Sequence, residues 1–474
     1  MNKILVSSLS KIALETTLRA DFGYMDMDNR LSTNTYYTFD DLFYIVEDNK
    51  VEDFSTLDTF GYAEIGNTNS YNQVSPNYLN WDDQNEINEP LFKKIKKGDI
   101  IAVQQGDILI SKVRPYLKKF IYITEEYSKL YFTSAFIHIR PKKPNILLYY
   151  ALKSCFLLNL MAISRQGKGY PTISAKDLKY LKFQKTYVDR LFKNSSVITP
   201  KILTIESKIN CLFSSLQPID AIVNDVFLKY IKIPFEQIES DYQQVYYVNS
   251  CELDSYDIRT SFRFNNPKYQ YLSDAIFQYH TFADFIDDEK TTLGRQMSPD
   301  FIEEDSDLFY INTNSIKLTG FVDSVLTPIS AEFYNKNQKL KVEKGDILLI
   351  ASGEGSIGRS CIFDCDADCI TSQFIMKIHH KKDTDTEYLN FFMHSFYFQF
   401  CVEKFKKGKG NMTNIFVSQL LDFPLYYPDK NVRERIVAEV RQSIEKRDLI
   451  IQEIENLRNQ IDTLLEEIIH NIKD

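Results

Sequence analysis

The stretch Val103-Gln104-Gln105-Gly106-Asp107-Ile108-Leu109-Ile110-Ser111 decides the fold, because it returns 239 residues later as Val342-Glu343-Lys344-Gly345-Asp346-Ile347-Leu348-Leu349-Ile350. Four further matches follow the same order at offsets between 238 and 245: Thr133–Ile137 with Thr371–Ile375, Gly167–Gly169 with Gly408–Gly410, Thr38–Phe39 with Thr281–Phe282, and Asn67–Ser70 with Asn312–Ser315. Chance does not readily produce five ordered matches at a nearly constant spacing. The chain is therefore predicted to contain two copies of one unit of about 240 residues.

The same predicted elements recur within each copy. A Gly-Asp turn introduces a short buried strand at 107–113 and at 346–352, and alternating strands follow in the first copy at 119–124 and 135–140. A helix is then predicted at 147–163 and at 387–405, followed by a Gly-Lys-Gly loop and a short helix. In the first copy Ser174 and Asp177 have capping-box spacing, with Asp where Glu or Gln is usual.

A long helical segment closes each copy. The first spans about 199–232, where Pro218 is expected to break it, and the last spans about 431–472, roughly 60 Å of helix. Apolar residues of the last segment step by four and three, which is a heptad seam that requires a partner helix. The expected partner is the first segment, and the predicted seam consists of Ile205, Ile209, Leu212, Leu216, Ile450, Ile454, Leu457, Ile461, Leu464 and Ile468.

These patterns predict an α+β protein with two pseudo-repeated mixed α/β domains, separated by two long helices packed as an antiparallel coiled coil. The predicted boundaries are 1–195 and 236–428 for the domains, and 196–235 and 429–474 for the helical regions. The longest apolar run is too short and too interrupted to span a bilayer, and the N-terminal apolar stretch is too short for a secretory signal. Seven cysteines, an odd number, fit free thiols in a reducing compartment. We therefore expect a cytoplasmic protein without membrane association.

Charge is unevenly distributed along the chain. The net charge is −9, but residues 1–90 carry −11 and residues 91–190 carry +14, while 331–430 is neutral. The basic segment could simply pair with the acidic segment before it. Because like charges usually disperse over a surface, the alternative favoured here is that the basic segment meets a polyanion.

Four motifs with chemical potential have simpler explanations. Gly353–Gly358 fits the dinucleotide pattern G-x-G-x-x-G, but the sequence after it predicts a strand where that fingerprint needs a helix, so we expect a hairpin loop with positive φ. Asn266-Pro267-Lys268-Tyr269 lacks the second Pro of amino-methyltransferases and is interpreted as a turn. Cys361, Cys365 and Cys369 match no zinc or iron–sulfur spacing and are expected at an exposed hairpin tip, with a weak metal site as the alternative. His379-His380 is expected to be solvated.

No phosphate loop, nucleophile elbow or nuclease carboxylate cluster is recognisable, so the sequence favours a binding role without catalytic residues, metal or cofactor in this chain. Basic and aromatic loops recur at equivalent positions of both copies, where lysines could neutralise phosphates and other polar side chains could read base edges. A purely structural role for the Gly-Lys-Gly loops stays open. The candidate DNA-binding residues are Lys112, Arg114, Tyr116, Lys118, Lys119, Arg165, Lys168, Tyr170, Ser352, Arg359, Lys406, Lys407, Lys409 and Asn411.

The repeated arrangement resembles the specificity subunit of Type I restriction–modification systems. The resemblance covers essentially the whole chain and is carried by the Gly-Asp strands, by the segments after Gly167 and Gly408, and by Arg259–Tyr269 at the start of the second half. It implies a non-catalytic reader of double-stranded DNA with a split target. It also implies that the paired helices set the spacing and dock methyltransferase subunits, which restriction/translocase subunits join. AdoMet, ATP and Mg²⁺ would then belong to those partners.

Two other functions stay open at this point. A fused DNA methyltransferase or restriction enzyme recognition protein would need an AdoMet loop, and none is visible. A coiled-coil adaptor without DNA binding would lack the steep salt dependence that a DNA reader shows.

Overall fold

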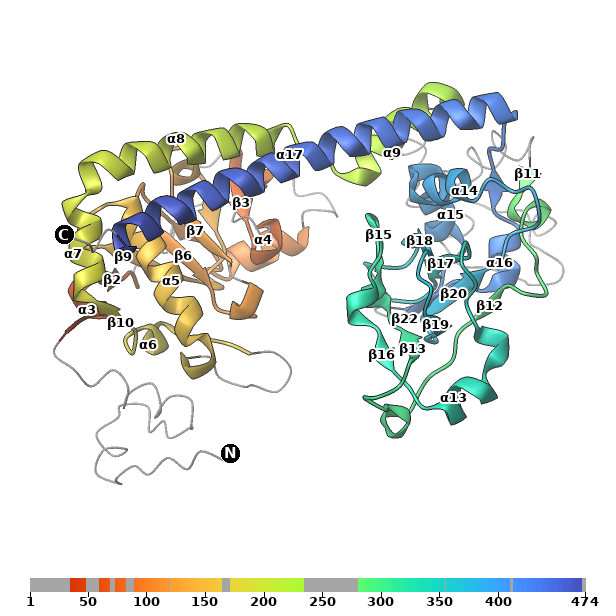
Figure 1. Cartoon of the computed structure of the whole chain (residues 1–474). Helices are drawn as coiled ribbons and strands as arrows, with labels where there is room; N and C mark the ends of the chain where they lie inside the picture. Colours follow the sequence, from red (N-terminus) through yellow and green to blue (C-terminus); the bar gives the residue numbers. More distant parts are fainter. Residues whose placement is uncertain are drawn as a thin grey trace. The chain divides into compact units, whose positions relative to one another are not determined.

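A computed structural model of the chain describes residues 35–47, 59–68, 73–81, 89–117, 119–163, 171–233, 280–353, 355–409 and 412–470 (Figure 1). The chain divides into two compact units. Unit 1 consists of Met1–Ser215 with Gln452–Asp474, and unit 2 consists of Leu216–Ile451. This division assigns one part of the last helix to each unit, whereas the sequence-based boundaries treat the helical regions as separate segments.

Unit 1 contains an antiparallel sheet and a mixed sheet. The central antiparallel sheet has the order β2 (Phe43–Ile45), β9 (Phe136–Pro141), β6 (Ile108–Ser111), β7 (Phe120–Tyr122). A second sheet has the order β4 (Asn77–Asn80), β3 (Thr59–Ala63), β8 (Tyr131–Phe132), β5 (Ile101–Ala102), and its β3–β8 pair is parallel. Strand β1 (Tyr36–Thr38) pairs with β10 (Lys182–Gln184). The helices of its domain are α3 (Phe39–Leu42), α4 (Glu89–Lys96), α5 (Ile146–Ile163), α6 (Ala175–Leu178) and α7 (Lys185–Lys193).

Unit 2 repeats this topology. Its central sheet has the order β12 (Thr292–Leu293), β20 (Ile375–Ile378), β17 (Ile347–Ile350), β18 (Ser360–Ile362). A second sheet has the order β16 (Thr327–Pro328), β13 (Leu308–Ile311), β19 (Asp368–Thr371), with a parallel β13–β19 pair. The two-stranded pairs are β11 (His280–Thr281) with β23 (Pro424–Leu425), β14 (Ile316–Lys317) with β15 (Gly320–Phe321), and β21 (Lys407–Lys409) with β22 (Met412–Asn414).

Strand register confirms the predicted duplication. Ser111 pairs with Phe136 in unit 1, and Ile350 pairs with Ile375 in unit 2, so both members of the pair are displaced by 239 residues. A one-residue slip would turn the buried Ile and Leu side chains of β6 and β17 to the wrong face of the sheet. The same apolar pattern therefore dictates the same register twice.

A buried carboxylate lies just before the central strand of each unit. Asp107 accepts hydrogen bonds from Arg140 Nε at 2.7 Å and lies 2.7 Å from His138 Nε2. Burial opposes ionisation of Asp107, but these partners outweigh it and hold the pKa of the carboxyl below its usual value. In unit 2, Asp346 lies 2.7 Å from Nδ1 of His379. The prediction of a solvated His379 is therefore wrong, because that ring is half-buried against this carboxylate.

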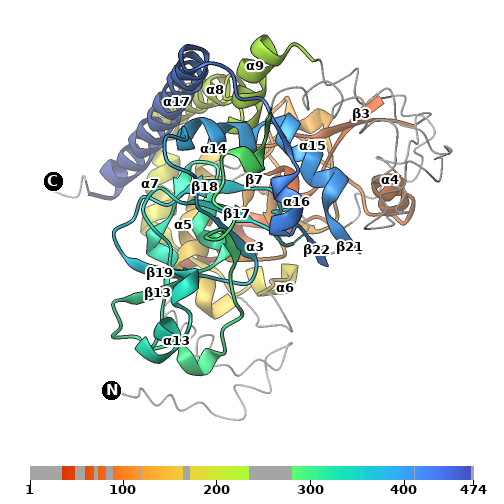
Figure 2. The same ribbon diagram turned by 90° about the vertical axis from the view of Figure 1, so that its right-hand side faces the viewer.

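Helices pack on the central sheet of each unit, as Figure 2 shows for unit 2. Helix α5 confirms the prediction over 147–163, and the Ser174–Asp177 capping box opens α6. The helix predicted over 387–405 is broken into α14 (Thr386–His394) and α15 (Phe396–Phe405). The break occurs at Ser395, where the next backbone N–H, that of Phe396, donates to Asn224 Oδ1 at 2.6 Å. Two shorter helices, α13 (Ala331–Lys336) and α16 (Val417–Leu421), complete the unit.

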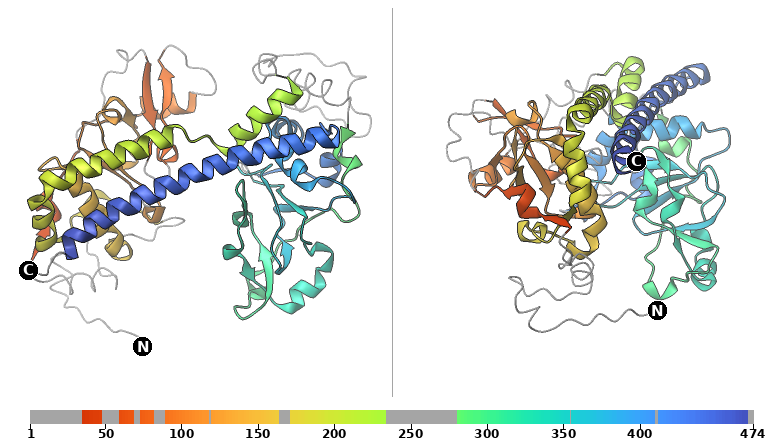
Figure 3. Two further views of the ribbon diagram at one scale, coloured as in Figure 1. Left: turned by 45° about the horizontal axis from the view of Figure 1, so that its top comes forward. Right: turned by 60° about the vertical axis from the view of Figure 1, so that its left-hand side comes forward.

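The long helical segments confirm the predicted break. Helix α8 (Ser195–Ser214) ends before Pro218, which caps the start of α9 (Ile219–Ile231). Helix α17 (Lys430–His470) runs antiparallel to α9 in unit 2, because Arg447 reaches the carbonyl of Gln217 whereas Glu439 pairs with Lys229 at 3.1 Å. In unit 1 the remainder of α17 lies beside α8 (Figures 1 and 3). The predicted pairing of the long helices is thus confirmed.

Burial refines the predicted seam. Ile209 of α8 and Ile454, Leu457 and Ile461 of α17 are buried, whereas Ile205, Leu212, Ile450 and Leu464 are half-buried. Leu465 is buried beside Leu464, because a straight helix drifts from a strict 3.5-residue repeat. Leu216 lies in the connection between α8 and α9, so its placement on a helical stripe is wrong. The side chain of Ile468 lies outside the described residues.

Candidate nucleic-acid interface

In unit 1 the structure brings two segments of the predicted interface together. The segment after β6 pairs with the segment that follows the Gly-Lys-Gly loop through a bridge between Val113 and Thr172. The Arg114 N–H donates to Pro171 O at 2.9 Å, and the Ile173 N–H donates to Lys112 O at 2.9 Å. Segments about 60 residues apart in sequence therefore share one edge of the domain.

Unit 2 builds the equivalent edge. Ser352 forms a bridge with Asn414, and the backbone N–H of Gly353 donates to Thr413 O at 3.2 Å. The neighbouring β21–β22 hairpin carries Lys407 on an exposed position. We call the two equivalent segments the unit 1 edge (residues 111–117, 119 and 171–173) and the unit 2 edge (residues 351–353, 355–359, 407–409 and 412–415).

The G-x-G-x-x-G segment of the unit 2 edge confirms the predicted hairpin loop. Gly353, Gly355 and Gly358 have φ values of +109°, +81° and +90°, and strands β17 and β18 flank them. A Cβ on Gly358 would lie 2.4 Å from the side-chain oxygen of Gln399, so a larger residue does not fit there. Glycine is therefore explained by the turn and not by a bound dinucleotide.

The cations of the unit 1 edge are partly engaged by the protein itself. Lys112 Nζ donates to Ser134 O at 2.6 Å, and Lys119 Nζ donates to Ile65 O at 2.7 Å. Burial lowers the pKa of the Lys112 and Lys119 ammonium groups below the ordinary value for lysine. Arg114 is half-buried with a φ of +50°, whereas Tyr116 is exposed. Their backbone contacts fix this loop in place.

The unit 2 candidates are placed unequally. Lys407 is exposed, and Ser352 and Arg359 are half-buried. Lys406 is only 5 % exposed and its ammonium lies 2.7 Å from Glu403, so the expectation that it faces a ligand is wrong. The Lys406 side chain turns inward because α15 ends there and the strand that follows alternates its faces. Strand β21 places the backbone of Lys409 but not its side chain, and Lys118, Arg165, Lys168, Tyr170 and Asn411 lie outside the described residues.

Some basic residues between 91 and 190 do pair with the acidic segment before them. Lys94 lies 2.5 Å from Glu64, and Lys179 lies 3.7 Å from Asp40. These ion pairs are exposed or half-buried, and neither of them includes Lys112, Arg114 or Lys119. Mutual pairing therefore accounts for part of the charge in this window, and the edge residues are a separate group.

The cysteines do not lie at an exposed hairpin tip as predicted. Cys361 and Cys369 are buried on β18 and β19 in one apolar cluster, while Cys365 between them is half-buried. Burial raises the pKa of the Cys361 and Cys369 thiols to about 12. In the described part of the chain no group of three His, Cys, Asp or Glu side chains could hold a metal ion. Asn266–Tyr269 and Arg259–Tyr269 lie outside the described residues.

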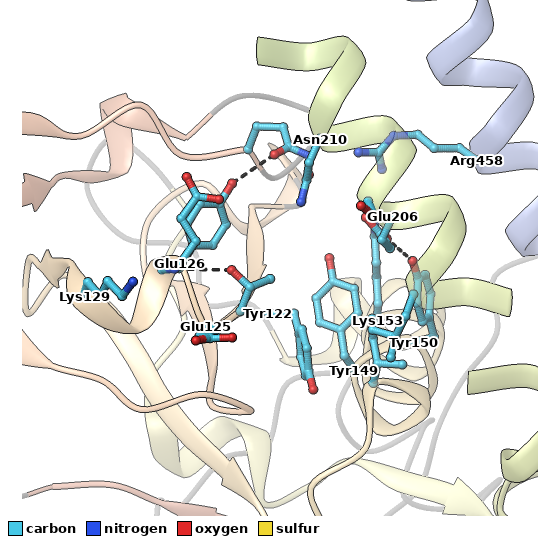
Figure 4. Close-up of a pocket in the computed structure, with 16 residues that line it drawn as sticks. Tyr122, Glu125, Glu126, Lys129, Tyr149, Tyr150, Lys153, Glu206, Asn210 and Arg458 are labelled. Atoms are coloured by element: carbon cyan, nitrogen blue, oxygen red, sulfur yellow. Dashed lines mark hydrogen bonds between the residues drawn. The ribbon is translucent and has the colours of Figure 1, made fainter. Parts of the chain in front are cut away.

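A separate cleft of about 480 Å³ lies in unit 1 beside the long helices (Figure 4). Tyr122, Tyr149 and Tyr150 line it together with Glu206 of α8 and Arg458 of α17. Tyr150 donates to the Glu206 carboxylate and ties α5 to α8. Burial raises the pKa of the Tyr150 hydroxyl well above its usual value. No sequence pattern pointed to this cleft, because its residues come from five separate segments.

Fold and site define a class of protein. It is a duplicated chain in which each of two mixed α/β units presents one loop edge, and a long helical segment follows each repeat in the sequence. Residues 298–459 match the family model of the Type I restriction modification DNA specificity domain. This match covers about a third of the chain, and over that range the chain is similar to DNA specificity domains of Type I restriction modification.

Three solved structures are similar to this chain, two of which are specificity subunits. The HsdS subunit from Thermoanaerobacter tengcongensis has 13 % identity and a TM-score of 0.31, with 92 % of this chain and 97 % of that chain covered. The Type I S subunit from M. genitalium has 12 % identity and a TM-score of 0.38, with the same coverage. A chain from a study of complex assembly and conformational transition of the type I R-M system has 13 % identity, a TM-score of 0.35, and coverage of 91 % and 96 %.

Comparison with curated proteins gives no match. No helix in the described part of the chain combines the length and apolar character that crossing a bilayer requires.

Proposed function

We propose that this chain is the DNA specificity subunit of a Type I restriction–modification complex and reads a bipartite double-stranded DNA target, with one half-site read by the unit 1 edge and the other by the unit 2 edge. The observation that carries the proposal is the equivalent pair of bridges, Val113 with Thr172 and Ser352 with Asn414. Each bridge joins a loop after the central strand to the segment after a Gly-Lys-Gly sequence, so each unit presents a composite edge with cations. Phosphate contacts position such an edge, and side chains at its loops distinguish bases.

The long helices would set the spacing between the half-sites. Helix α17 contributes to both units, so it is a continuous connection that can hold two readers in register. Joining two short readouts in this way raises the effective concentration of the second after the first has bound. A longer helix would therefore change the spacing and leave each half-site unchanged.

Methyltransferase subunits would dock on the clefts beside the long helices. Unit 2 has a cleft of about 430 Å³ at the place equivalent to the unit 1 cleft. Leu203, Glu206, Ser207 and Asn210 line the first, and residues 238 positions later, Arg441, Ile444, Glu445 and Asp448, line the second. Ile219 in the second is matched 239 positions later by Arg458 in the first. Equivalent clefts support two docking places, while AdoMet, ATP and Mg²⁺ would be bound by the partner subunits.

Methylation mapping tests this function most directly. Genomes of cells with and without the gene should differ in methylation at one bipartite motif with a fixed spacer. A chain with four residues inserted into α8 should methylate the same half-sites at a changed spacing. If the half-sites themselves change, the assignment of spacing to the helices fails. If deleting the gene leaves methylation unchanged, DNA specificity for a methyltransferase fails.

A further inference from the structure

Large apolar side chains gather on the unit 1 edge. Val113, Tyr116 and Leu117 are 37 %, 47 % and 42 % exposed, and all three belong to one five-residue stretch. Single exposed apolar residues are common on protein surfaces, but three within five consecutive residues, which we call the unit 1 patch, require an explanation.

This patch is held outward by its backbone. Ser111 Oγ donates to Val113 O at 2.7 Å, and the Arg114 N–H donates to Pro171 O at 2.9 Å. Pro115 is buried, and the Leu117 N–H closes the turn onto Arg114 O at 2.9 Å. Because these bonds pin the loop at both ends, its apolar side chains are pre-organised to contact a partner.

Exposed apolar residues also lie beside the unit 2 edge, although they come from other positions of the repeat. Phe374 and Phe416 are each 44 % exposed. The carbonyl of Phe374 accepts from the Ala351 N–H at 2.8 Å, directly before Ser352, and Phe416 follows Asn414 by two residues. The two phenylalanines thus flank the Ser352–Asn414 bridge. In unit 1, Val113 itself forms the bridge with Thr172, and Leu117 follows four residues later.

Charge around these patches favours DNA as the partner. Lys112, Arg114 and Lys119 belong to the same loop as Val113 and Leu117, and the exposed Lys407 lies on the hairpin that precedes Phe416. Aliphatic and phenyl side chains offer no hydrogen bond to a base. The one apolar group that the major groove presents is the C5-methyl of thymine.

We propose that Val113 and Leu117 in unit 1, and Phe374 and Phe416 in unit 2, contact thymine methyl groups and so select thymine in the half-site that each unit reads. This inference rests on the proposed function, since it names the base feature read at the same edges. It predicts that each half-site contains thymine on one of its strands at the positions facing these side chains.

Deoxyuridine provides a direct test, because it removes only the C5-methyl group. The full chain, assembled with its modification subunits, is titrated with duplexes that carry the mapped target. In one half-site at a time every thymine is replaced by deoxyuridine, and the dissociation constant is measured by fluorescence anisotropy. The unmodified protein should bind about fourfold more weakly for each methyl group in the interface that is removed.

Two double variants assign the effect to residues. V113A/L117A should bind the thymine and deoxyuridine duplexes equally at the unit 1 half-site and keep its sensitivity at the other half-site. F374A/F416A should show the reverse. The matched controls are V197A in unit 1 and V325A in unit 2, which truncate exposed side chains outside the two edges and should leave every ratio unchanged.

Equal binding of both duplexes by the unmodified protein would overturn the inference. A double variant that weakens binding of both duplexes by the same factor would also overturn it, because that result indicates a wedge between base steps or a structural role. Sequence-independent binding by the unmodified complex would instead overturn the proposed function itself.

Discussion

Units 1 and 2 share a topology but differ in the chemistry placed on it. Both have a central antiparallel sheet with the same register, and both pair a buried aspartate with a basic side chain before the central strand. Their edges differ: unit 1 has a cationic and apolar turn at 112–119, whereas unit 2 has a glycine loop and a β-hairpin. The comparison teaches that apolar register preserves the scaffold while exposed loops are free to diverge, which the proposed reading of two different half-sites would require.

The largest expected effect comes from breaking the helix seam within unit 1. Ile461→Asn both truncates a side chain that is 2 % exposed and buries an unpaired amide, so it should destabilise the helix pair by about 5 kcal/mol. Unit 1 should then unfold at lower urea than unit 2, and copurification of methyltransferase subunits should fall. Leu449→Asn on the same helix is the control, because Leu449 is exposed. An unchanged urea midpoint would contradict the importance of the seam.

The next largest effect should come from removing the buried aspartate of each unit, which compares the stability that Asp107 and Asp346 contribute. Asp107→Ala leaves Arg140 and His138 without their shared carboxylate and should cost about 3–5 kcal/mol of unfolding free energy. Asp346→Ala should cost less, since it removes the partner of one imidazole, whereas Asp107→Ala removes the partner of a guanidinium and an imidazole. Asp366→Ala, an exposed ion pair, serves as the control. Equal losses for the two buried sites would refute the proposed difference.

The pH dependence of the Asp107 pairing follows from its pKa. The folded-state pKa lies below the unfolded value, so the pairing stabilises the fold above about pH 4 and is lost as the pH falls through the folded value. Native protein should therefore lose stability on acidification more steeply than Asp107→Ala. Urea unfolding at a series of pH values between about 3 and 6 measures this slope. Parallel slopes would show that Asp107 is not the group responsible.

Charge removal on the edges should have a smaller effect on binding. Neutralising Lys112, Arg114, Lys118 and Lys119 together should weaken DNA binding and reduce the salt slope, by about 0.9 for each phosphate that is no longer neutralised. Because Lys112 and Lys119 already donate to backbone carbonyls, the reduction should be below the value for four phosphates. Lys94→Gln, which removes an ion pair outside the edge, is the control. An unchanged salt slope would remove the unit 1 edge from the interface.

The smallest effect concerns the caps at the start of each domain. Thr38 Oγ1 accepts from the Asp41 N–H at 3.2 Å, whereas the contact at Thr281 is from its own N–H to the Asp284 carboxylate. Thr38→Ala should therefore cost about 1 kcal/mol of unfolding free energy, and Thr281→Ala less. Thr463→Ala on the exposed face of α17 provides a baseline. A larger loss at Thr281 would show that the two caps are not ranked by their hydrogen bonds.

Local and repeated features were predictable from sequence. The offset of 239 residues, the break at Pro218 and the glycine loop at 353–358 each depend on neighbouring residues or on a periodic pattern. The burial and the surroundings of individual side chains were not predictable from sequence. Lys406 is buried, His379 meets Asp346, and Cys361 joins an apolar cluster, because the residues that surround these side chains come from positions that only the sheet and helix packing bring near.

The sequence by itself determined the duplication, the central strand of each copy with the helical region after it, and the presence of a helical seam, since apolar periodicity and turn residues act over short distances along the chain. The tertiary structure alone decided which loops share an edge. The Val113–Thr172 and Ser352–Asn414 bridges join segments about 60 residues apart, and closing such loops depends on the packing of the whole unit.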